Sequence, residues 1–415
     1  MEMIDIPASE FCDSVRDGTH DSPKPVESPG KPLVTSKHMK GGRINLEDAY
    51  LISGSDFEKV NQRSQVHQWD VLISMIGTLG ELVLVKDEPN YAIKNIGLFK
   101  TKSKYDGLWL YYYLQSPKAK NHMHTSAQGS TQQYLSLKTL RGFPLSVPDS
   151  ETDKRAICEV LKTIDDKIEL NQKMNQTLEA IAKAIFTSWF VDFDPVRAKA
   201  EGRPTGLPPE ISDLFPDELV DSEIGEIPKG WSVSTLGDLV IPKKGKSITK
   251  KNVVEGSVPV VAGGLSPAYY HNTSNVKAPT VTISASGANA GFARLYNEDI
   301  WASDCSYICE EQTPFVFLWY VFFKIYQENI YHMQQGAAQP HIYPSDLMRL
   351  QLAYPGSDEL WHRALDLVAP MFLRIGNIDK ESVVLSELRD TLLPKLISGE
   401  LRIPDAEKFL EEAGV

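Results

Sequence analysis

The sequence predicts two similar α+β domains, each followed by one long helix. The main observation is an internal repeat in the 415-residue chain, because GSTQQYLSLKTLRGFPLSVP (129–148) returns as GAAQPHIYPSDLMRLQLAYP (336–355) without a gap. The register continues beyond this motif, where Leu178 matches Leu385. A period of 207 positions is far longer than the roughly 20–50 residues of solenoid or propeller units. The repeat therefore indicates a duplicated domain with its helix, and we expect an approximate two-fold relation between the copies.

Each copy has the same predicted order of elements. In the first copy, short apolar runs separated by Gly, Pro and Asn predict strands at 70–74, 81–85 and 97–99. An aromatic helix is expected at about 108–115 (LWLYYYLQ). The second copy repeats these segments, since VLISMIGTLG (71–80) corresponds to VTISASGANA (281–290) and WLYYYL (109–114) corresponds to FLWYVF (317–322). Both copies are therefore expected to be compact α+β domains.

A heptad pattern of apolar residues follows each domain. In the first copy it runs from Ile157 to Trp189 at alternate steps of four and three, and the second copy keeps the same phase. This pattern predicts a coiled coil. Asn171 and Asn175 interrupt the first seam, and such polar positions typically fix register and partner orientation. An alternative is that each helix only covers its own domain, but about 33 residues give roughly 50 Å of helix, which is more than that role requires.

Proline and acidic residues mark the boundaries between these segments. Residues 194–230 are rich in Pro, Gly and acids, which predicts a linker with a short helical turn near 216–220. Pro394 is expected to end or kink the second helix near residue 393. The predicted divisions are a first domain (1–150), a first helix (151–193), a linker (194–230), a second domain (231–356) and a second helix with the C-terminal tail (357–415).

The net charge of −12 is unevenly distributed along the chain. Residues 1–150 hold 17 Lys+Arg and 17 Asp+Glu, and residues 232–356 hold 9 of each, so the acidity lies in the helical and linking segments. Attraction to phosphates by this chain alone is therefore expected to be modest, which favours a basic partner at any DNA contact. The four cysteines, the N-terminal sequence and the short apolar runs predict a cytoplasmic protein with reduced thiols and no membrane span.

Motifs that would indicate catalysis are incomplete. Gly245-Lys246-Ser247 resembles the end of a phosphate-binding loop, but that loop requires glycine where Val240 stands. The sequence contains no Asp/Asn-Pro-Pro-aromatic motif of amino-methyltransferases and no glycine-rich dinucleotide-binding turn. Cys305 and Cys309 have no second pair of metal ligands at a suitable spacing. We therefore expect a chain that is not an enzyme and has no cofactor or metal of its own.

Side chains that suit hydrogen bonding to base edges collect in the loops of both copies. Any one of them could equally be a solvated loop residue, but the repeat aligns Tyr134 with His341 and Gln132 with Gln339. The candidate DNA-binding residues are Lys37, His38, Lys40, Arg43, Arg63, Thr131, Gln132, Gln133 and Tyr134 in the first domain, and Lys243, Lys244, Lys246, Ser247, Gln339 and His341 in the second.

Four segments resemble one known family in the order in which that family has them. They are DGTHDSPK (17–24), SWFVDFDPVRAKAEG (188–202), LFPDELVDSEIGEIPKGW (214–231) and LLPKLISGELRI (392–403). The chain is similar to the specificity subunit of type I restriction-modification systems, over essentially its whole length. On this resemblance, Thr19 and His20 join the candidate DNA-binding residues. The second domain departs from the pattern, because it has KKGKSITK in place of DGTHDSPK, so the two half-sites are expected to differ.

The resemblance implies two target-recognition domains joined by two long antiparallel coiled-coil helices, with each domain reading one half of a gapped DNA sequence. It implies double-stranded DNA, two methyltransferase subunits that carry the S-adenosylmethionine site, and ATP-driven restriction (translocase) subunits as partners in phage defence. The residues expected to pair the helices and dock partners are Ile157, Leu161, Ile164, Ile168, Leu178, Ile185, Trp189, Met371, Ile375, Ile378, Leu385, Leu392 and Leu396.

Two other functions are compatible with these observations. One is the specificity arm of another methyltransferase or phage-defence system, which separate methyltransferase and translocase genes beside this one would distinguish. The other is a coiled-coil scaffold whose two domains bind protein. That scaffold predicts that substitution of Lys37, Arg43 and Lys244 leaves DNA affinity unchanged in the assembled complex, whereas a DNA-specificity subunit predicts a reduced dependence on salt.

Overall fold

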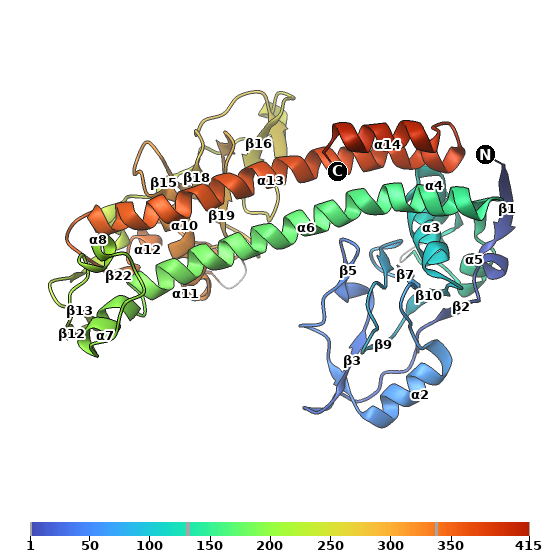
Figure 1. Ribbon diagram of the computed structural model, residues 1–415, viewed down its shortest axis with the longest axis horizontal. Helices are drawn as coiled ribbons and strands as arrows, with labels where there is room; N and C mark the ends of the chain where they lie inside the picture. Colours follow the sequence, from blue (N-terminus) through green and yellow to red (C-terminus); the bar gives the residue numbers. More distant parts are fainter. Residues whose placement is uncertain (1, 130–132, 337–338, 415) are drawn as a thin grey trace. The chain divides into compact units, whose positions relative to one another are not determined.

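The computed structural model describes residues 2–129, 133–336 and 339–414. The chain divides into two compact units: the first comprises residues 1–169 and 382–415, and the second comprises residues 170–381. Each unit contains one of the repeated domains and one part of each long helix (Figure 1).

The first domain contains two small sheets packed with helices. Its antiparallel sheet has the order β2-β10-β7-β8, formed by Ser14–Asp17, Ile96–Lys100, Val71–Ser74 and Leu82–Leu84. The second sheet has the order β6-β3-β9, formed by Leu51–Ile52, Lys31–Val34 and Ala92–Ile93, with β3 parallel to β9. The helix α3 (Lys104–Gln115) buries Trp109 and Tyr113 in the core beside Phe99. The predicted strands and aromatic helix of this domain are confirmed.

The second domain has the same two sheets. Its antiparallel sheet has the order β15-β21-β18-β19, formed by Lys243–Lys244, Cys305–Cys309, Thr280–Ser284 and Ala293–Tyr296. Its other sheet has the order β17-β16-β20, formed by Tyr269–His271, Val258–Val261 and Trp301–Ala302, with β16 parallel to β20. Strand for strand, this matches the first domain in order and direction. The predicted internal duplication is therefore confirmed in three dimensions.

The repeated sequence motif forms the same structure in both domains. Tyr134 and His341 each form an isolated bridge with the residue six positions earlier, which closes a loop. Gly129 and Gly336 in these loops have φ angles of 96° and 92°, a region that glycine adopts without steric cost. Each loop leads to a short helix and a closing strand, which are α5 (Leu137–Arg141) and β11 (Pro144–Pro148) in the first domain, and α12 (Pro344–Leu347) and β22 (Gln351–Tyr354) in the second.

Short elements complete the two domains. In the first domain they are β1 (Met3–Pro7, paired with β11), α1 (Ala8–Phe11), η1 (Ser36–His38), β4 (Met39–Lys40), β5 (Arg43–Ile44), α2 (Gly54–Ser64) and α4 (Pro117–Ser126). In the second domain they are β14 (Ser232–Thr235, paired with β22), α9 (Leu236–Leu239), η2 (Lys250–Asn252), α10 (Val316–Ile325) and α11 (Gln327–His332).

Two helices of 40 residues each, α6 (Glu151–Phe190) and α13 (Glu359–Ser398), lie side by side within each unit (Figure 1). In the first unit the guanidinium of Arg389 donates to Asp165 at 2.9 Å. Within the second unit the amide of Asn171 donates to Glu381 at 3.1 Å and the amide of Asn175 donates to Asp379 at 2.7 Å. Residue numbers rise along one helix as they fall along its neighbour, so the pair is antiparallel, as the resemblance implied.

One alternative for Pro394, that it ends the helix near residue 393, is wrong, because α13 continues through Pro394 to Ser398. A proline inside a helix costs about 3 kcal/mol or more, but Leu392 and Leu396 are at most 2 % exposed, and full burial of two such side chains contributes roughly 3–6 kcal/mol. This packing offsets the cost. The helix α14 (Ile403–Glu412) then packs on the core of the first unit.

The linker is more ordered than its composition predicts, and it has no helical turn at 216–220. It forms α7 (Asp194–Ala200), α8 (Pro209–Ser212) and a hairpin of β12 (Leu219–Ser222) with β13 (Gly225–Pro228). The prediction failed because Leu219 and Val220 pair with the opposite strand of this hairpin and pack on the core of the second unit.

Candidate nucleic-acid interface

A polar loop in the first domain is folded around a buried histidine. His38 is 3 % exposed; its Nδ1 accepts from the Thr35 amide at 2.8 Å, and its Nε2 lies 3.3 Å from the Asp48 carbonyl oxygen. Both ring nitrogens are therefore used inside the domain, and the ring holds the loop in shape instead of being available to a base. The candidates around it, Lys37, Lys40 and Arg43, are exposed on η1, β4 and β5.

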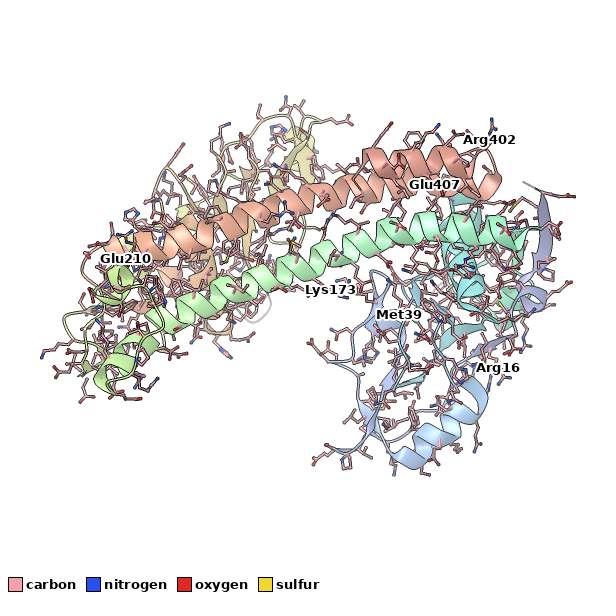
Figure 2. All side chains as sticks on the ribbon, viewed as in Figure 1. Arg16, Met39, Lys173, Glu210, Arg402 and Glu407 are labelled. Carbon is pink, nitrogen blue, oxygen red and sulfur yellow. The ribbon has the colours of Figure 1, made fainter. Side chains whose placement is uncertain are left out.

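The turn after β2 carries a closed network of charged groups. The carboxylate of Asp17, which is 5 % exposed, accepts from the Arg63 guanidinium and lies 3.0 Å from His20 Nε2. The other ring nitrogen of His20 lies 2.8 Å from Asn95 Oδ1. Arg16 points toward α2 (Figure 2), where its guanidinium donates to the Arg63 carbonyl at 2.8 Å. Asp17 thus holds both candidate residues, His20 and Arg63, in place at the surface.

The turn after β15 is basic and lacks such a network. Lys243, Lys244, Lys246 and Ser247 are all exposed. Within the three described stretches of chain, no carboxylate lies within 4.0 Å of these lysine ammonium groups. The backbone of the turn is nevertheless fixed, because Trp301 Nε1 donates to the Lys246 carbonyl at 2.9 Å. The turn therefore presents unpaired positive charge to solvent on a fixed backbone.

These two turns occupy the same place in their domains. The amide of Gly18 donates to the first residue of β10 (2.9 Å), and the amide of Gly245 donates to the first residue of β21 (2.8 Å). A Cβ at Gly18 would lie 2.4 Å from the Ile93 carbonyl oxygen, and a Cβ at Gly245 would lie 2.3 Å from that of Ser303. Within the segment KKGKSITK that stands in place of DGTHDSPK, KGKS (244–247) is therefore the positional equivalent of DGTH (17–20), with different side chains.

The repeated loop carries matched aromatic residues in the two domains. Tyr134 is 41 % exposed, and the His341 ring stacks on Tyr343, which is 46 % exposed, with centroids 6.2 Å apart. Gln133 and Gln339 are exposed beside them. Thr131 and Gln132, the other candidates in this loop, lie outside the described residues. The loop therefore offers planar and hydrogen-bonding side chains at equivalent positions of both domains.

The apolar seam residues of the long helices are used for packing inside the units. Ile157, Leu161, Ile164, Trp189, Ile375, Ile378, Leu385, Leu392 and Leu396 are buried, while Ile168, Leu178, Ile185 and Met371 are partly buried against the two cores. Their burial supports helix pairing. It also means that most of these residues are not available for docking partner proteins.

A second apolar stripe on α6 is exposed. Leu170, Met174 and Ile181 are 54 %, 38 % and 43 % exposed, and Thr177 and Ala184 continue the spacing along a shallow surface groove. These positions stand one residue before the seam and repeat at the same steps of four and three. The signal was therefore present in the sequence, but periodicity alone could not tell which of two adjacent stripes faces the partner helix.

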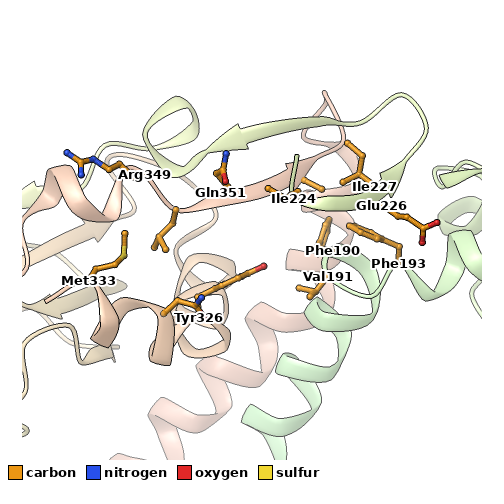
Figure 3. Close-up of a pocket in the computed structure, with 13 residues that line it drawn as sticks. Phe190, Val191, Phe193, Ile224, Glu226, Ile227, Tyr326, Met333, Arg349 and Gln351 are labelled. Carbon is orange, nitrogen blue, oxygen red and sulfur yellow. The ribbon is translucent and has the colours of Figure 1, made fainter. Parts of the chain in front are cut away.

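A cavity of about 460 Å³ lies in the second unit (Figure 3). The end of α6, the β12–β13 hairpin, α11 and β22 line it, with Phe190, Phe193, Tyr326 and Met333 beside the polar Glu226 and Arg349. None of its lining residues is Ser, Cys or His, and none is a candidate DNA-binding residue. Its lining therefore provides no Ser–His or Cys–His pair of nucleophile and base.

The four cysteines are buried and free. Burial raises the pKa of the Cys12 and Cys305 thiols to about 12, so they remain protonated and unreactive at neutral pH. Over the described residues, no group of three or more His, Cys, Asp or Glu side chains could hold a metal ion. The helices in the same residues include none that is long and apolar enough to cross a membrane.

Two duplicated α+β domains with exposed basic loops, carried on one antiparallel helix pair, define a modular nucleic-acid recognition protein. The model of the family described as "Type I restriction modification DNA specificity domain" matches residues 8–180 and 228–359. The chain belongs to this family. The match confirms the predicted recognition of DNA sequence and, because the family is a specificity domain and not a catalytic one, the prediction of a non-catalytic subunit.

Named relatives agree with this assignment. The chain is 25 % identical over 318 residues to the type I restriction enzyme MjaIX specificity subunit of Methanocaldococcus jannaschii, which covers 72 % of this chain and 69 % of the relative. It is 27 % identical over 341 residues to the HindI specificity subunit of Haemophilus influenzae, with coverages of 67 % and 73 %. The crystal structure of a type I S subunit from M. genitalium matches with a TM-score of 0.57 at 16 % identity, covering 95 % of this chain and 96 % of that one. This likeness supports the fold.

Proposed function

We propose that this chain selects the target of a type I restriction-modification complex by reading a gapped, two-part DNA sequence. Residues 1–150 read one half-site and residues 231–356 read the other. The observation that carries the proposal is the duplication of one domain, with the same strand order in both sheets, on an antiparallel helix pair. A protein with two similar domains suits a ligand with two half-sites.

The exposed candidates in the loops are proposed to contact the DNA. Lys37, Lys40 and Arg43 supply positive charge in the first domain, and the turn after β15 supplies it in the second. Tyr134 and His341 occupy equivalent loops in the two domains. Lysine and arginine suit phosphates and guanine edges, whereas amide and aromatic side chains suit base edges and stacking. His38 is excluded from this set by its burial, and its proposed role is to shape its loop.

Two methyltransferase subunits, and restriction subunits with them, are proposed as the protein partners that carry the catalytic chemistry in the cytoplasm. The exposed stripe Leu170, Met174 and Ile181 is the proposed docking surface for an apolar helix of a methyltransferase subunit. Its spacing is that of a coiled-coil seam, and its residues remain exposed after α6 has packed against α13. This proposal replaces the buried seam as the docking surface.

A methylome determined by long-read sequencing tests this function. Cells would express the partner methyltransferase with and without this chain, and we expect a two-part methylated motif with a fixed gap only when the chain is present. Exchange of residues 1–150 for the equivalent domain of a relative should change one half of that motif. Assembly of the complex without any motif would favour a scaffold function, and a change in both halves would contradict the modular assignment.

A further inference from the structure

The two equivalent turns differ most in charge. DGTH (17–20) places a carboxylate where KGKS (244–247) places an ammonium group, and it places Thr19 where Lys246 stands. Both turns start from the edge strand of the antiparallel sheet and are fixed by a glycine that no other residue can replace without a backbone clash. The comparison is therefore between two side-chain sets on one backbone geometry.

The first turn has its charges paired internally. Asp17 neutralises Arg63 and contacts His20, and the His20 ring uses its second nitrogen on Asn95. An arginine that is already paired with a buried carboxylate releases fewer counterions from DNA than a free cation does, because its charge is largely compensated before binding. This turn is therefore expected to contribute position and shape with little net attraction for phosphate.

The second turn has its charges unpaired. Lys243, Lys244 and Lys246 are exposed without a carboxylate within 4.0 Å in the described chain, and Lys250 and Lys251 extend the exposed basic segment onto η2. Trp301 Nε1 donates to the Lys246 carbonyl, and the Ile248 amide donates to Ser303 Oγ, so the backbone of the turn is held in place. A run of unpaired ammonium groups on an ordered backbone is complementary to a polyanion.

We propose that the lysine turn 243–247 binds the phosphate backbone beside the second half-site through its ammonium groups, and that the equivalent turn of the first domain makes no such phosphate contact. The inference rests on the proposed function, since it concerns the DNA held by these domains. The two equivalent turns are therefore electrostatically unequal, although residues 1–150 and residues 232–356 each hold equal numbers of acidic and basic residues.

The test is the salt dependence of DNA binding by the whole chain assembled with its methyltransferase, on a duplex with the motif that this complex methylates. The variant Lys244→Ala/Lys246→Thr removes two ammonium groups from the turn. Each phosphate contact contributes about 0.9 to the slope of log K against log salt concentration, so we expect the slope to fall by about 1.8. Affinity relative to wild type should then change roughly 12-fold between 50 and 200 mM salt, equally for every DNA sequence.

A reciprocal variant and a matched control complete the experiment. Thr19→Lys places an ammonium group on the first turn and should raise the slope by about 0.9. Lys229→Ala/Lys277→Ala removes the same charge from two exposed lysines that are paired with Glu218 and Asp299, and it should leave the slope unchanged. An equal loss in this control would show a net-charge effect and overturn the proposal.

The outcomes separate this inference from the proposed function. A wild-type complex that methylates no two-part motif contradicts the proposed function itself. If the wild-type complex methylates a two-part motif but Lys244→Ala/Lys246→Thr leaves the salt slope unchanged, only the proposed phosphate contact of the lysine turn is overturned. A relaxed second half-site with an unchanged slope also overturns it, because the lysines would then read bases.

Discussion

The helix pair offers a direct test of how the gap between half-sites is set. The unit boundary falls between residues 169 and 170 in α6 and between residues 381 and 382 in α13. Duplicating Ile164–Leu170 in α6 and Ile375–Glu381 in α13 adds one heptad to each helix at this boundary. Because the helices are antiparallel and pair here through Asn171 and Glu381 at 3.1 Å, the two added heptads face each other and the seam phase is kept.

The expected change in the gap between half-sites follows from helix geometry. Seven residues add about 10.5 Å of helix, and duplex DNA rises about 3.4 Å per base pair, so the gap should lengthen by roughly three base pairs. The added heptad rotates a straight helix by only about 20°, so the apolar seam of each helix nearly keeps its phase.

The assay is the methylome of cells that express the lengthened chain with its methyltransferase. We expect both half-sites to stay the same while the gap between them lengthens. A heptad added to α6 alone is the control, since it leaves unmatched layers in the pair and should abolish methylation. A folded, active complex with the original gap would refute the assignment of the helices as the spacer.

Three further predictions concern single features. Leu170→Glu/Ile181→Glu should weaken assembly with the methyltransferase about 30-fold in a pull-down titration, because each half-exposed side chain contributes about 1 kcal/mol on burial and 1.4 kcal/mol is a factor of ten. The control Leu265→Glu, which changes an exposed leucine of the second domain, should leave this affinity unchanged. Burial raises the pKa of the Asp379 carboxyl above its ordinary value, so the folded chain binds a proton at this carboxyl more tightly than the unfolded chain does. The folded chain therefore loses stability as the pH rises from the unfolded pKa through the higher folded pKa. Asp379→Asn should therefore raise the melting temperature at pH 7, and this gain should shrink toward pH 4. An equal gain at pH 7 and pH 4 would contradict the assignment of the pH dependence to Asp379. Gly18→Ala should destabilise the first domain by about 1–3 kcal/mol, measured by urea unfolding, whereas Gly54→Ala, at a helix position with free space around it, should not.

The duplication and the long helices could be predicted because their signals are periodic. A repeated motif without gaps and a heptad seam depend on residue spacing, and spacing is fully visible in one sequence. The strands at 71–74, 82–84 and 96–100 were visible for the same reason, since apolar runs bounded by turn residues produce them. The course of the linker was not visible, because its hairpin depends on pairing and on burial of Ile227 against another segment.

The candidate interface was predicted by residue type but not by arrangement. Lys37, Lys40 and Arg43 are exposed as a DNA contact requires, whereas His38 has the same polar neighbours in sequence and is buried. Burial of a polar ring depends on partners such as the Asp48 carbonyl, and no local sequence pattern predicts these partners. The exposed stripe on α6 was missed for a related reason, since two adjacent stripes shared one spacing and packing decided between them.

The sequence by itself determined the family, the duplication and the antiparallel helical connection, because each is encoded in motifs or periods that survive without coordinates. The tertiary structure decided which side chains are available. DGTH and KGKS stand 227 positions apart, outside the 207-residue register of the repeat, and share only a glycine. The bonds of Gly18 and Gly245 to β10 and β21, strands distant in sequence, hold the two turns at the same place in their domains. Long-range backbone hydrogen bonds fix the positions of the two turns whatever their side chains are. The charge difference between the turns can therefore be compared only in the folded chain.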